Sequence, residues 1–197
     1  QQIRALVNAI DFLTTEMVRV QNRLRDILER YYPQATILFS KLDTKINLEF
    51  IMLYPNPESA KALTFEEFQA FCKANRYPKP KRIAEIYGRL YADFPKSNPS
   101  TVLIFQDEAA SLAEMLVIMK DFQREKEKQL EKKFKTHPDF EIYQSLPGTG
   151  KLLAPALLAI LVELKQHFPN PEVLQAVAGT SPVTFSSGKR KTVRFRY

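Results

Sequence analysis

The sequence predicts a mainly α fold: long helices that form a coiled-coil stalk with a small helical insertion, followed by a helix-hairpin-helix domain that ends in a short β-hairpin. Apolar residues recur at alternating intervals of three and four near the N-terminus and again in the middle of the chain, as on helices that pack together. Thirteen prolines against five glycines indicate many short helices with hard stops. A hydrophobic fraction of 45% over 197 residues can supply a core for one large domain or two small ones.

The first thirty-one residues carry the clearest periodicity and predict one long helix. Its apolar seam consists of Ile3, Leu6, Ile10, Leu13, Met17, Val20, Leu24, Ile27 and Tyr31. Arg19, Arg23 and Arg30 lie off this seam on a basic face. Such a stripe is usually a solvated helix surface, and the alternative is contact with a nucleic-acid backbone along the stalk.

Short helices separated by prolines are predicted after Pro33, which ends the first helix. Thr64-Phe65-Glu66-Glu67 is a capping box, in which the threonine hydroxyl and the second glutamate carboxylate satisfy each other's backbone amides. The expected elements are an irregular segment and a short apolar helix over residues 36–54, a helix from Thr64 to about Asn75, a stiff extended linker over 77–80 and a helix over 81–93.

A second long helix is predicted from Ser97 to Lys135, because apolar residues again keep the three-to-four rhythm. Its second half, residues 124–135, mixes charges with few apolar side chains and is expected to be a solvated arm. The economical architecture pairs this helix with the first one, antiparallel in the same chain, with the helices of residues 35–95 inserted at one end. A partner subunit can share the seam as well, so a homo-oligomer through the coiled coil is expected.

A domain boundary is predicted at His137-Pro138-Asp139, which divides the chain into a helical coiled-coil region, 1–136, and a second domain, 137–197. The second domain opens with the spacing of a helix-hairpin-helix over 139–164, with helices over 139–144 and 151–164 and Pro155 near the first turn of the latter. Backbone N–H groups at such a glycine turn can hold a phosphate of DNA. The candidate DNA-binding residues here are Gly148, Thr149, Gly150 and Lys151.

The C-terminal residues predict one more helix over 171–178 and then a small β-hairpin around Ser-Ser-Gly-Lys, because apolar and polar residues alternate on both sides of it. Residues 189–197 contribute +5 of the net charge of +7, whereas residues 137–185 carry a balance of −2. We therefore expect the tail to attract DNA at long range and the glycine turn to grip it. The basic candidates are Lys189, Arg190, Lys191, Arg194 and Arg196.

Several kinds of site are not expected. Cys72 is alone, which excludes a disulfide framework and a cysteine metal site, and His137 and His167 have no third ligand at helical spacing. The carboxylates form no convincing two-metal cluster. No apolar run reaches roughly 18 residues and no signal-peptide pattern begins the sequence, so a cytoplasmic protein without a membrane partner is predicted.

Ser187, with Ser186 beside it, is the candidate nucleophile. A serine before a glycine in a hairpin most often serves the turn itself. The basic cluster after it favours a catalytic role, because a serine that attacks a phosphodiester needs cations around phosphorus more than it needs a histidine.

These motifs resemble the C-terminal transposase domain of the Piv/MooV-like insertion-sequence recombinases, the IS-one-ten type. The resemblance rests on Leu146-Pro-Gly-Thr-Gly, Leu152-Leu-Ala-Pro-Ala-Leu-Leu, Phe168-Pro-Asn, Val177-Ala-Gly-Thr-Ser-Pro-Val and Ser186-Ser-Gly-Lys-Arg-Lys in this order. The first helix, with Arg19, Asn22, Arg23, Leu24 and Arg25, is similar to the segment between the two catalytic domains of this family.

The resemblance implies a DNA transposase or site-specific recombinase of the prokaryotic nucleoid. In the family, a RuvC-like N-terminal domain binds metal, expected to be magnesium, through four acidic residues. A serine of the C-terminal domain acts together with that domain in strand exchange. A noncoding bridge RNA chooses the DNA partners. The family serine corresponds to Ser187, or to its neighbour Ser186, and the glycine turn to Gly148 and Gly150. The RuvC-like acids have no counterpart here, so a fragment without its own cofactor is expected, inactive alone though the full-length protein is an enzyme.

Two other functions stay open from the sequence. The alternative is a noncatalytic nucleic-acid-binding and dimerisation module that uses the arginine face and the basic tail, for which binding should fall steeply with added salt. A purely structural coiled-coil scaffold would assemble without salt-dependent affinity for nucleic acid.

Overall fold

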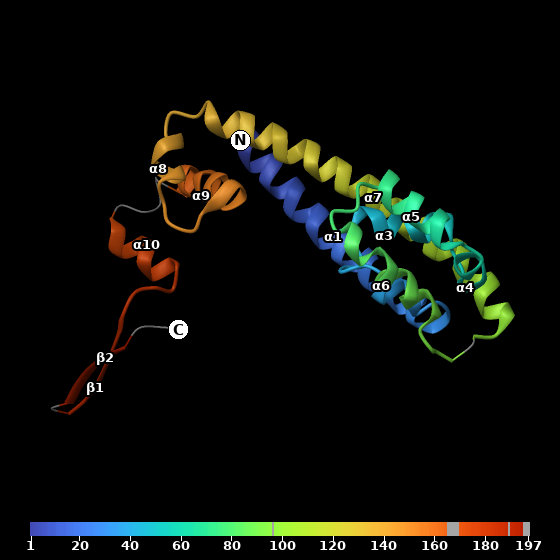
Figure 1. Cartoon of the computed structure of the whole chain (residues 1–197). Coiled ribbons are helices and arrows are strands. Elements are labelled where there is room, and N and C mark those ends of the chain that lie inside the picture. The colour runs from blue at the N-terminus through green and yellow to red at the C-terminus, as the bar shows by residue number, and fades with distance from the viewer. Residues whose placement is uncertain (96, 165–169, 189, 195–197) are drawn as a thin grey trace. The chain divides into compact units, whose positions relative to one another are not determined.

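The computed structural model describes residues 1–95, 97–164, 170–188 and 190–194, and among these the side chains of residues 163 and 164 are left out. Figure 1 shows that the fold is mainly α, as predicted, with one short β-hairpin near the C-terminus. The chain divides into two compact units. Unit 2 is Asn8–Lys128, and unit 1 combines Gln1–Val7 with Gln129–Tyr197.

The two long helices are α1, Gln2–Tyr31, and α7, Pro99–Lys135. Between them lie α2 (Gln34–Ile37), α3 (Lys45–Leu53), α4 (Pro57–Lys61), α5 (Phe65–Ala74), η1 (Pro80–Arg82), α6 (Ile83–Gly88) and η2 (Arg89–Tyr91). After α7 come α8 (Phe140–Gln144), α9 (Gly150–Leu164), α10 (Pro171–Val177), β1 (Val183–Ser187) and β2 (Arg190–Arg194).

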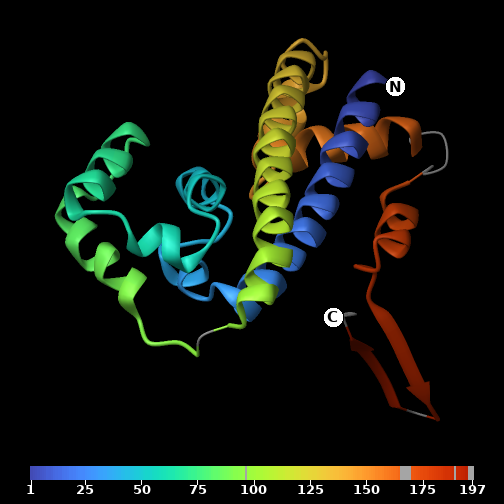
Figure 2. The ribbon, with the colours of Figure 1, turned by 90° about the vertical axis from the view of Figure 1, so that its right-hand side faces the viewer.

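In unit 2, α1 and α7 pack antiparallel in the same chain, as the periodicity predicted. The amide of Gln123 donates to the Thr14 hydroxyl at 2.8 Å, and the rings of Tyr31 and Phe105 stack 6.4 Å apart. Later residues of α1 thus meet earlier residues of α7, and Figure 2 shows the insertion to one side of this pair. The seam is buried at its C-terminal end, where Leu24 and Ile27 are fully enclosed, and partly buried at Met17 and Val20. A supercoil and a second copy on this seam stay predictions.

The core of unit 2 combines aliphatic side chains with a cluster of aromatic ones and lies between the insertion helices and the long pair. Phe50 is fully buried and meets the rings of Phe68 and Phe71 edge-on at 5.9 and 5.4 Å. Such pairs add to the stabilisation from burial alone. This core holds the insertion against α1 and α7.

The insertion contains two short helices that the sequence analysis did not predict, α2 and α4. In α4 the Asn56 side chain accepts a hydrogen bond from the Ser59 N–H at 2.8 Å, and Pro57 occupies the first turn. The predicted extended linker over 77–80 is wrong at its end, because Pro80 opens the 3₁₀ turn η1 instead. A proline is preset for the first helical position, so it can begin such a turn as easily as prevent one.

Helix α5 begins with the predicted capping box and ends in an unusual residue. The Thr64 N–H donates to the Glu67 carboxylate at 2.8 Å, and the Glu67 N–H donates to the Thr64 hydroxyl at 3.2 Å. At the other end Arg76 has φ of 51°, in the left-handed region where glycine is usual. A side chain there costs about 1 kcal/mol. The Tyr77 N–H donates to the Cys72 carbonyl at 2.9 Å and closes the cap.

Unit 1 has a small core at the end of α7. Phe134, Ala154 and Leu158 are buried, and the rings of Phe134 and Phe140 meet at 4.9 Å. The prediction of a solvated arm over 124–135 is therefore wrong at two positions, since Leu130 is 1% and Phe134 3% exposed. These two side chains lie four residues apart on one face of α7, where the later helices of the chain can cover them.

Helix α9 and the last elements follow the sequence pattern with one correction. Pro155 lies inside α9, beyond its first turn, so it offers no N–H to the carbonyl of Lys151. Asn170 caps α10 by accepting from the Val173 N–H at 3.0 Å. The predicted hairpin is present as antiparallel β1 and β2. None of the helices in the described part of the chain combines the length and apolar character that crossing a bilayer requires.

Candidate nucleic-acid interface

The β-hairpin brings the candidate serines beside the basic tail. Ser187 lies directly opposite Arg190, and Ser186 lies opposite Lys191. Gly188 begins the connection with φ of 57°, which glycine adopts without steric cost. The tight connection therefore sets the register that pairs each serine with a cation. Lys189 and Arg196, which the sequence analysis also named, lie outside the described residues.

The two serines lie on opposite faces of the hairpin, because neighbouring residues of a strand alternate and paired residues share a face. Ser187 shares its face with Arg190 directly across and with Arg194 further along the partner strand. Ser186 shares the other face with Lys191. The register thus places the two candidate serines, which are adjacent in the sequence, on different faces of the hairpin. Ser187 is the one that shares its face with Arg190 and Arg194.

The hairpin is exposed on both faces. Phe185 is 60% and Val193 58% exposed, and both serines are exposed as well. A two-stranded hairpin in water is marginally stable, so these strands are suited to docking on a larger partner. A nucleic acid is compatible with the charged residues, and the apolar ones are available to stack or pack.

The glycine turn joins α8 to α9. Gly148 has φ of 78° and Gly150 has φ of 52°. Thr149 is buried, and its hydroxyl donates to the carbonyls of Leu146 at 2.8 Å and Tyr143 at 3.3 Å. These bonds fasten the turn to α8. The first N–H groups of α9 have no carbonyl partner within the helix, which is the geometry that binds an anion.

The charges around the glycine turn are mixed. Lys151 is exposed in the first turn of α9. The ammonium of Lys135, which donates to Glu131 at 2.8 Å, lowers the pKa of that carboxyl, and the charge of Lys151 adds to the effect. An acid therefore lies within electrostatic range of Lys151. The role of this turn as a DNA-binding helix-hairpin-helix stays a prediction.

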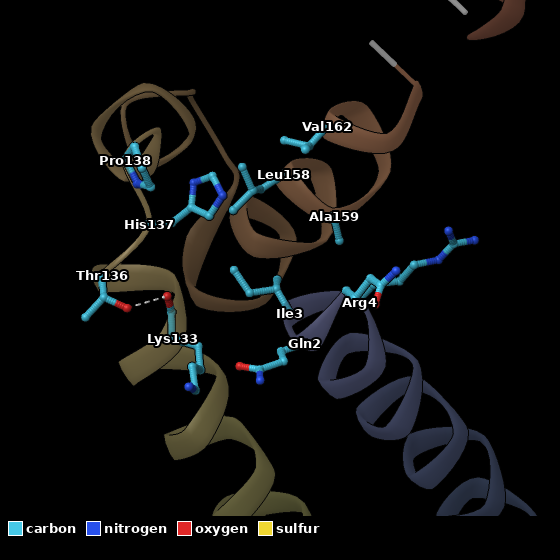
Figure 3. Close-up of a pocket in the computed structure, with 11 residues that line it drawn as sticks. Gln2, Ile3, Arg4, Lys133, Thr136, His137, Pro138, Leu158, Ala159 and Val162 are labelled. Carbon is cyan, nitrogen blue, oxygen red and sulfur yellow. Dashed lines mark hydrogen bonds between the residues drawn. The ribbon is translucent and has the colours of Figure 1, made fainter. Parts of the chain in front are cut away.

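A pocket of about 460 Å³ lies in unit 1, between the start of α1, the end of α7 and α9 (Figure 3). Arg4, Lys133 and His137 supply polar groups to its lining, and Ile3 and Leu158 supply apolar ones. The His137 Nδ1 accepts the Asp139 N–H at 3.2 Å, which orients the ring. No local sequence pattern indicates this pocket, because its walls come from α1, the end of α7 and α9, which lie far apart along the chain.

The three arginines of the predicted basic face are on the surface of α1 and are all ion-paired. Arg19 binds Glu16 at 2.6 Å, Arg23 binds Glu108 at 2.8 Å and Arg30 binds Asp26 at 2.9 Å. Exposed pairs contribute little to stability. They do place a carboxylate beside each guanidinium, so a phosphate would have to compete for it.

The described residues contain no group of three His, Cys, Asp or Glu side chains that could hold a metal ion. His167 lies outside them. Burial raises the pKa of the Cys72 thiol to about 11, so this cysteine stays protonated at neutral pH and is a poor nucleophile. The nucleophile candidates of the described chain remain the two serines.

Comparison with known proteins confirms the resemblance. Residues 141–197 match the model of the family described as "Transposase IS116/IS110/IS902 family". The chain is 27% identical over 203 residues to the mini-circle putative transposase for IS117 of Streptomyces coelicolor. The matched region covers 100% of this chain and 49% of that protein. It is also 27% identical over 194 residues to the insertion element IS110 uncharacterized 43.6 kDa protein of the same species. That match covers 95% of this chain and 46% of the relative.

A third relative is the insertion element IS116 uncharacterized 44.8 kDa protein of Streptomyces clavuligerus, 23% identical over 192 residues, which covers 95% of this chain and 47% of the relative. The chain thus spans about half the length of the curated relatives it matches. No solved structure matches the chain. The family match includes the glycine turn and the hairpin, the two features that the sequence analysis singled out.

Proposed function

We propose that this chain is part of a DNA transposase or site-specific recombinase in which Ser187 is the covalent nucleophile on a DNA phosphate. The observation that carries the proposal is the hairpin register, which sets Ser187 across from Arg190 and on the same face as Arg194. The match of residues 141–197 to a transposase family supports it.

The proposed step is a transfer of phosphorus from DNA to serine. The Ser187 Oγ forms a bond to phosphorus, and the bond from phosphorus to one DNA strand oxygen breaks. The serine proton leaves to solvent and the released strand oxygen takes up a proton, so atoms and charge balance. The guanidinium groups of Arg190 and Arg194 would stabilise the charge that develops on the phosphate oxygens. Reversal of the step on a new strand would complete the exchange.

Binding is proposed to be divided between two features. The amides of the glycine turn and Lys151 would hold a DNA phosphate, while Lys191 and the other basic residues of the tail attract the duplex. A noncoding guide RNA, which the resemblance implies, would choose the DNA sites, and two copies of the chain would assemble through the long helices. The protein would then act on DNA in the prokaryotic cytoplasm, at the nucleoid.

Magnesium, which the resemblance also implies, does not fit the described residues. They provide no set of three ligating side chains. The proposed serine step therefore uses only the hydroxyl of Ser187 and the guanidinium groups of Arg190 and Arg194.

The experiment is to trap a protein–DNA adduct that survives denaturation, using nicked suicide-substrate DNA and the longest natural form of the protein. We expect Ser187→Ala to abolish the adduct and to spare DNA binding, and Ser186→Ala to retain it. Loss in Ser186→Ala alone would assign the nucleophile to Ser186 and overturn the assignment to Ser187. An adduct in both variants would refute serine chemistry.

A matched pair of cation variants tests the register. Arg190→Gln and Lys191→Gln remove one charge each from adjacent positions, on opposite faces of the hairpin. Arg190→Gln should slow adduct formation about a hundredfold, as expected for loss of a group that stabilises the transition state, and Lys191→Gln by less than about tenfold. Equal losses would show that only the total charge matters.

The exposure of the hairpin also suits a second candidate function, the noncatalytic nucleic-acid-binding and dimerisation module. It predicts no adduct in any sample together with binding that weakens steeply as salt is added. The same experiment therefore separates the two functions.

A further inference from the structure

A second basic surface lies on unit 2, far along the sequence from the hairpin. Residues 68–84 contain five basic side chains and no acid. The basic side chains are Lys73, Arg76, Lys79, Lys81 and Arg82, and all are exposed. We refer to residues 73–82 as the 73–82 basic segment. It connects α5 to α6.

Most of the charge of this segment is not neutralised by the protein. Arg82 is paired with Glu85 through two hydrogen bonds of 2.9 and 2.8 Å. The other four cations have no acidic partner among the residues that the structure describes. The arginines of α1 that the sequence analysis named each have one. A phosphate that approaches the 73–82 basic segment therefore meets cations without an acidic partner among the described residues, whereas one that approaches these three arginines of α1 has to compete with a carboxylate.

The backbone of the segment is held in place although it is a connection between helices. The Tyr77 N–H is bonded to the Cys72 carbonyl, and the Tyr77 ring packs on Phe39 with centroids 5.8 Å apart. Pro78 and Pro80 fix their own φ angles, and residues 80–82 form η1. Cations on a fixed backbone lose less conformational freedom when they bind a ligand.

A hollow of about 650 Å³ lies beside the segment. Lys73, Arg76 and Tyr77 line it together with Gln69 on α5, and Glu66 is the acid in its lining. These four side chains, Lys73, Arg76, Tyr77 and Gln69, are hydrogen-bond donors that can meet phosphate or sugar oxygens, and two of the four carry a positive charge. The hollow is therefore suited to an anionic, polar ligand.

The helix dipole explains only part of this arrangement. Lys73 and Arg76 lie at the C-terminal end of α5, where cations offset the negative end of the dipole. Lys79 and Lys81 lie beyond the last turn of α5 and gain nothing from that effect. Arg76 also occupies a backbone conformation in which glycine would be less strained. The helix dipole therefore accounts for a charge at Arg76 but not for a side chain other than that of glycine at this φ.

We propose that the 73–82 basic segment binds the phosphodiester backbone of a nucleic acid. This site goes beyond the proposed function, because it lies on the insertion of unit 2 and not on the hairpin or the glycine turn. Backbone recognition by Lys and Arg carries no sequence information, so the segment positions the nucleic acid and does not select it. DNA and RNA share this chemistry.

The test compares two triple variants of the whole chain that each remove three positive charges. Arg76→Gly with Lys79→Gln and Lys81→Gln removes free cations, and Arg19→Gln with Arg23→Gln and Arg30→Gln removes ion-paired ones. Glycine is unstrained at φ of 51°, so the first triple is expected to fold at least as well as the unmodified chain, which circular dichroism checks. The probes are a short mixed-sequence duplex DNA and an RNA hairpin.

The segment triple should weaken binding at least about tenfold at low salt and reduce the slope of log affinity against log salt by about 2 to 3. The α1 triple should change both quantities less. Unchanged binding in the segment triple, equal losses in the two triples, or no binding by the unmodified chain would each overturn the proposal. A loss with DNA alone or with RNA alone supports it and names the nucleic acid.

Adduct formation at Ser187, measured in the same variants, keeps the two proposals separate. An adduct together with unchanged binding in the segment triple would refute only the segment as a binding site. No adduct together with a specific loss of binding in the segment triple would support the segment and refute the serine chemistry.

Discussion

Phe134 is the residue whose removal tests the small core of unit 1 most directly. It is 3% exposed and packs edge-on against Phe140 with ring centroids 4.9 Å apart. A phenylalanine buries about 150 to 250 Å², which at about 25 cal/mol per Å² corresponds to about 4 to 6 kcal/mol. Residual burial in the unfolded chain lowers this to about 3 kcal/mol. Phe134→Ala should destabilise unit 1 by that amount.

Phe122→Ala is the matched control, because it makes the same change on the same helix. Phe122 is 46% exposed and has the Lys126 ammonium 4.8 Å from its ring centroid. Its loss should cost less than about 1 kcal/mol, since half the ring is already in water and an exposed cation–π contact contributes about 0.5 kcal/mol.

Hydrogen exchange of peptides from α8 and α9 is the assay, because it reports on unit 1 without assuming that both units unfold together. A loss of about 3 kcal/mol corresponds to about a hundredfold faster exchange, given about 1.4 kcal/mol per factor of ten. Exchange in α3 and α5 should not change. Unchanged exchange of α8 and α9 in Phe134→Ala, or an equal effect of Phe122→Ala, would refute the assignment of Phe134 to a core.

The remaining predictions concern unit 2. The Lys120 ammonium donates to the Asp43 carboxylate at 2.7 Å and holds the pKa of that carboxyl below its ordinary value. Because the folded pKa is lower than the unfolded value of about 3.9, the pair stabilises the fold above that pH and ceases to do so as pH falls through the folded pKa. The urea midpoint of Asp43→Asn should therefore fall less on acidification than that of the unmodified chain. An equal fall in the two proteins would contradict this. Thr64→Ala, which removes the capping box of α5, should cost about 1 kcal/mol in urea unfolding. Thr44→Ala at the start of α3, where the side chain makes no capping bond, should cost clearly less, and a reversed order would count against the capping assignment.

The long helices and the hairpin could be predicted because their signals are local. The seam from Ile3 to Tyr31 repeats at helical intervals, and it faces the protein interior in the structure. The capping box at Thr64 and the hairpin connection at Gly188 depend on groups within a few residues of each other. Local backbone geometry and hydrogen bonds between residues close in sequence determine such features, so neighbouring residues are enough to predict them.

Other features depend on segments that the chain brings together from a distance. Residues 124–135 read as a solvated arm because their composition is charged, yet Phe134 is buried by α8 and α9. The prediction failed there because burial depends on which surfaces meet. The pocket at His137 combines residues from α1, α7 and α9, and for the same reason no pattern within one segment indicates it.

The sequence by itself determined the helical periodicity, the glycine turn, the serines of the hairpin and the basic composition of the tail, because each depends on residues close together in the sequence. The tertiary structure decided which charges are free to bind. Arg23 meets Glu108 across 85 positions of the chain, whereas Lys79 and Lys81 meet no acid among the described residues. Electrostatic attraction acts through space, so a count of cations along the chain cannot tell a neutralised arginine from one available to a phosphate.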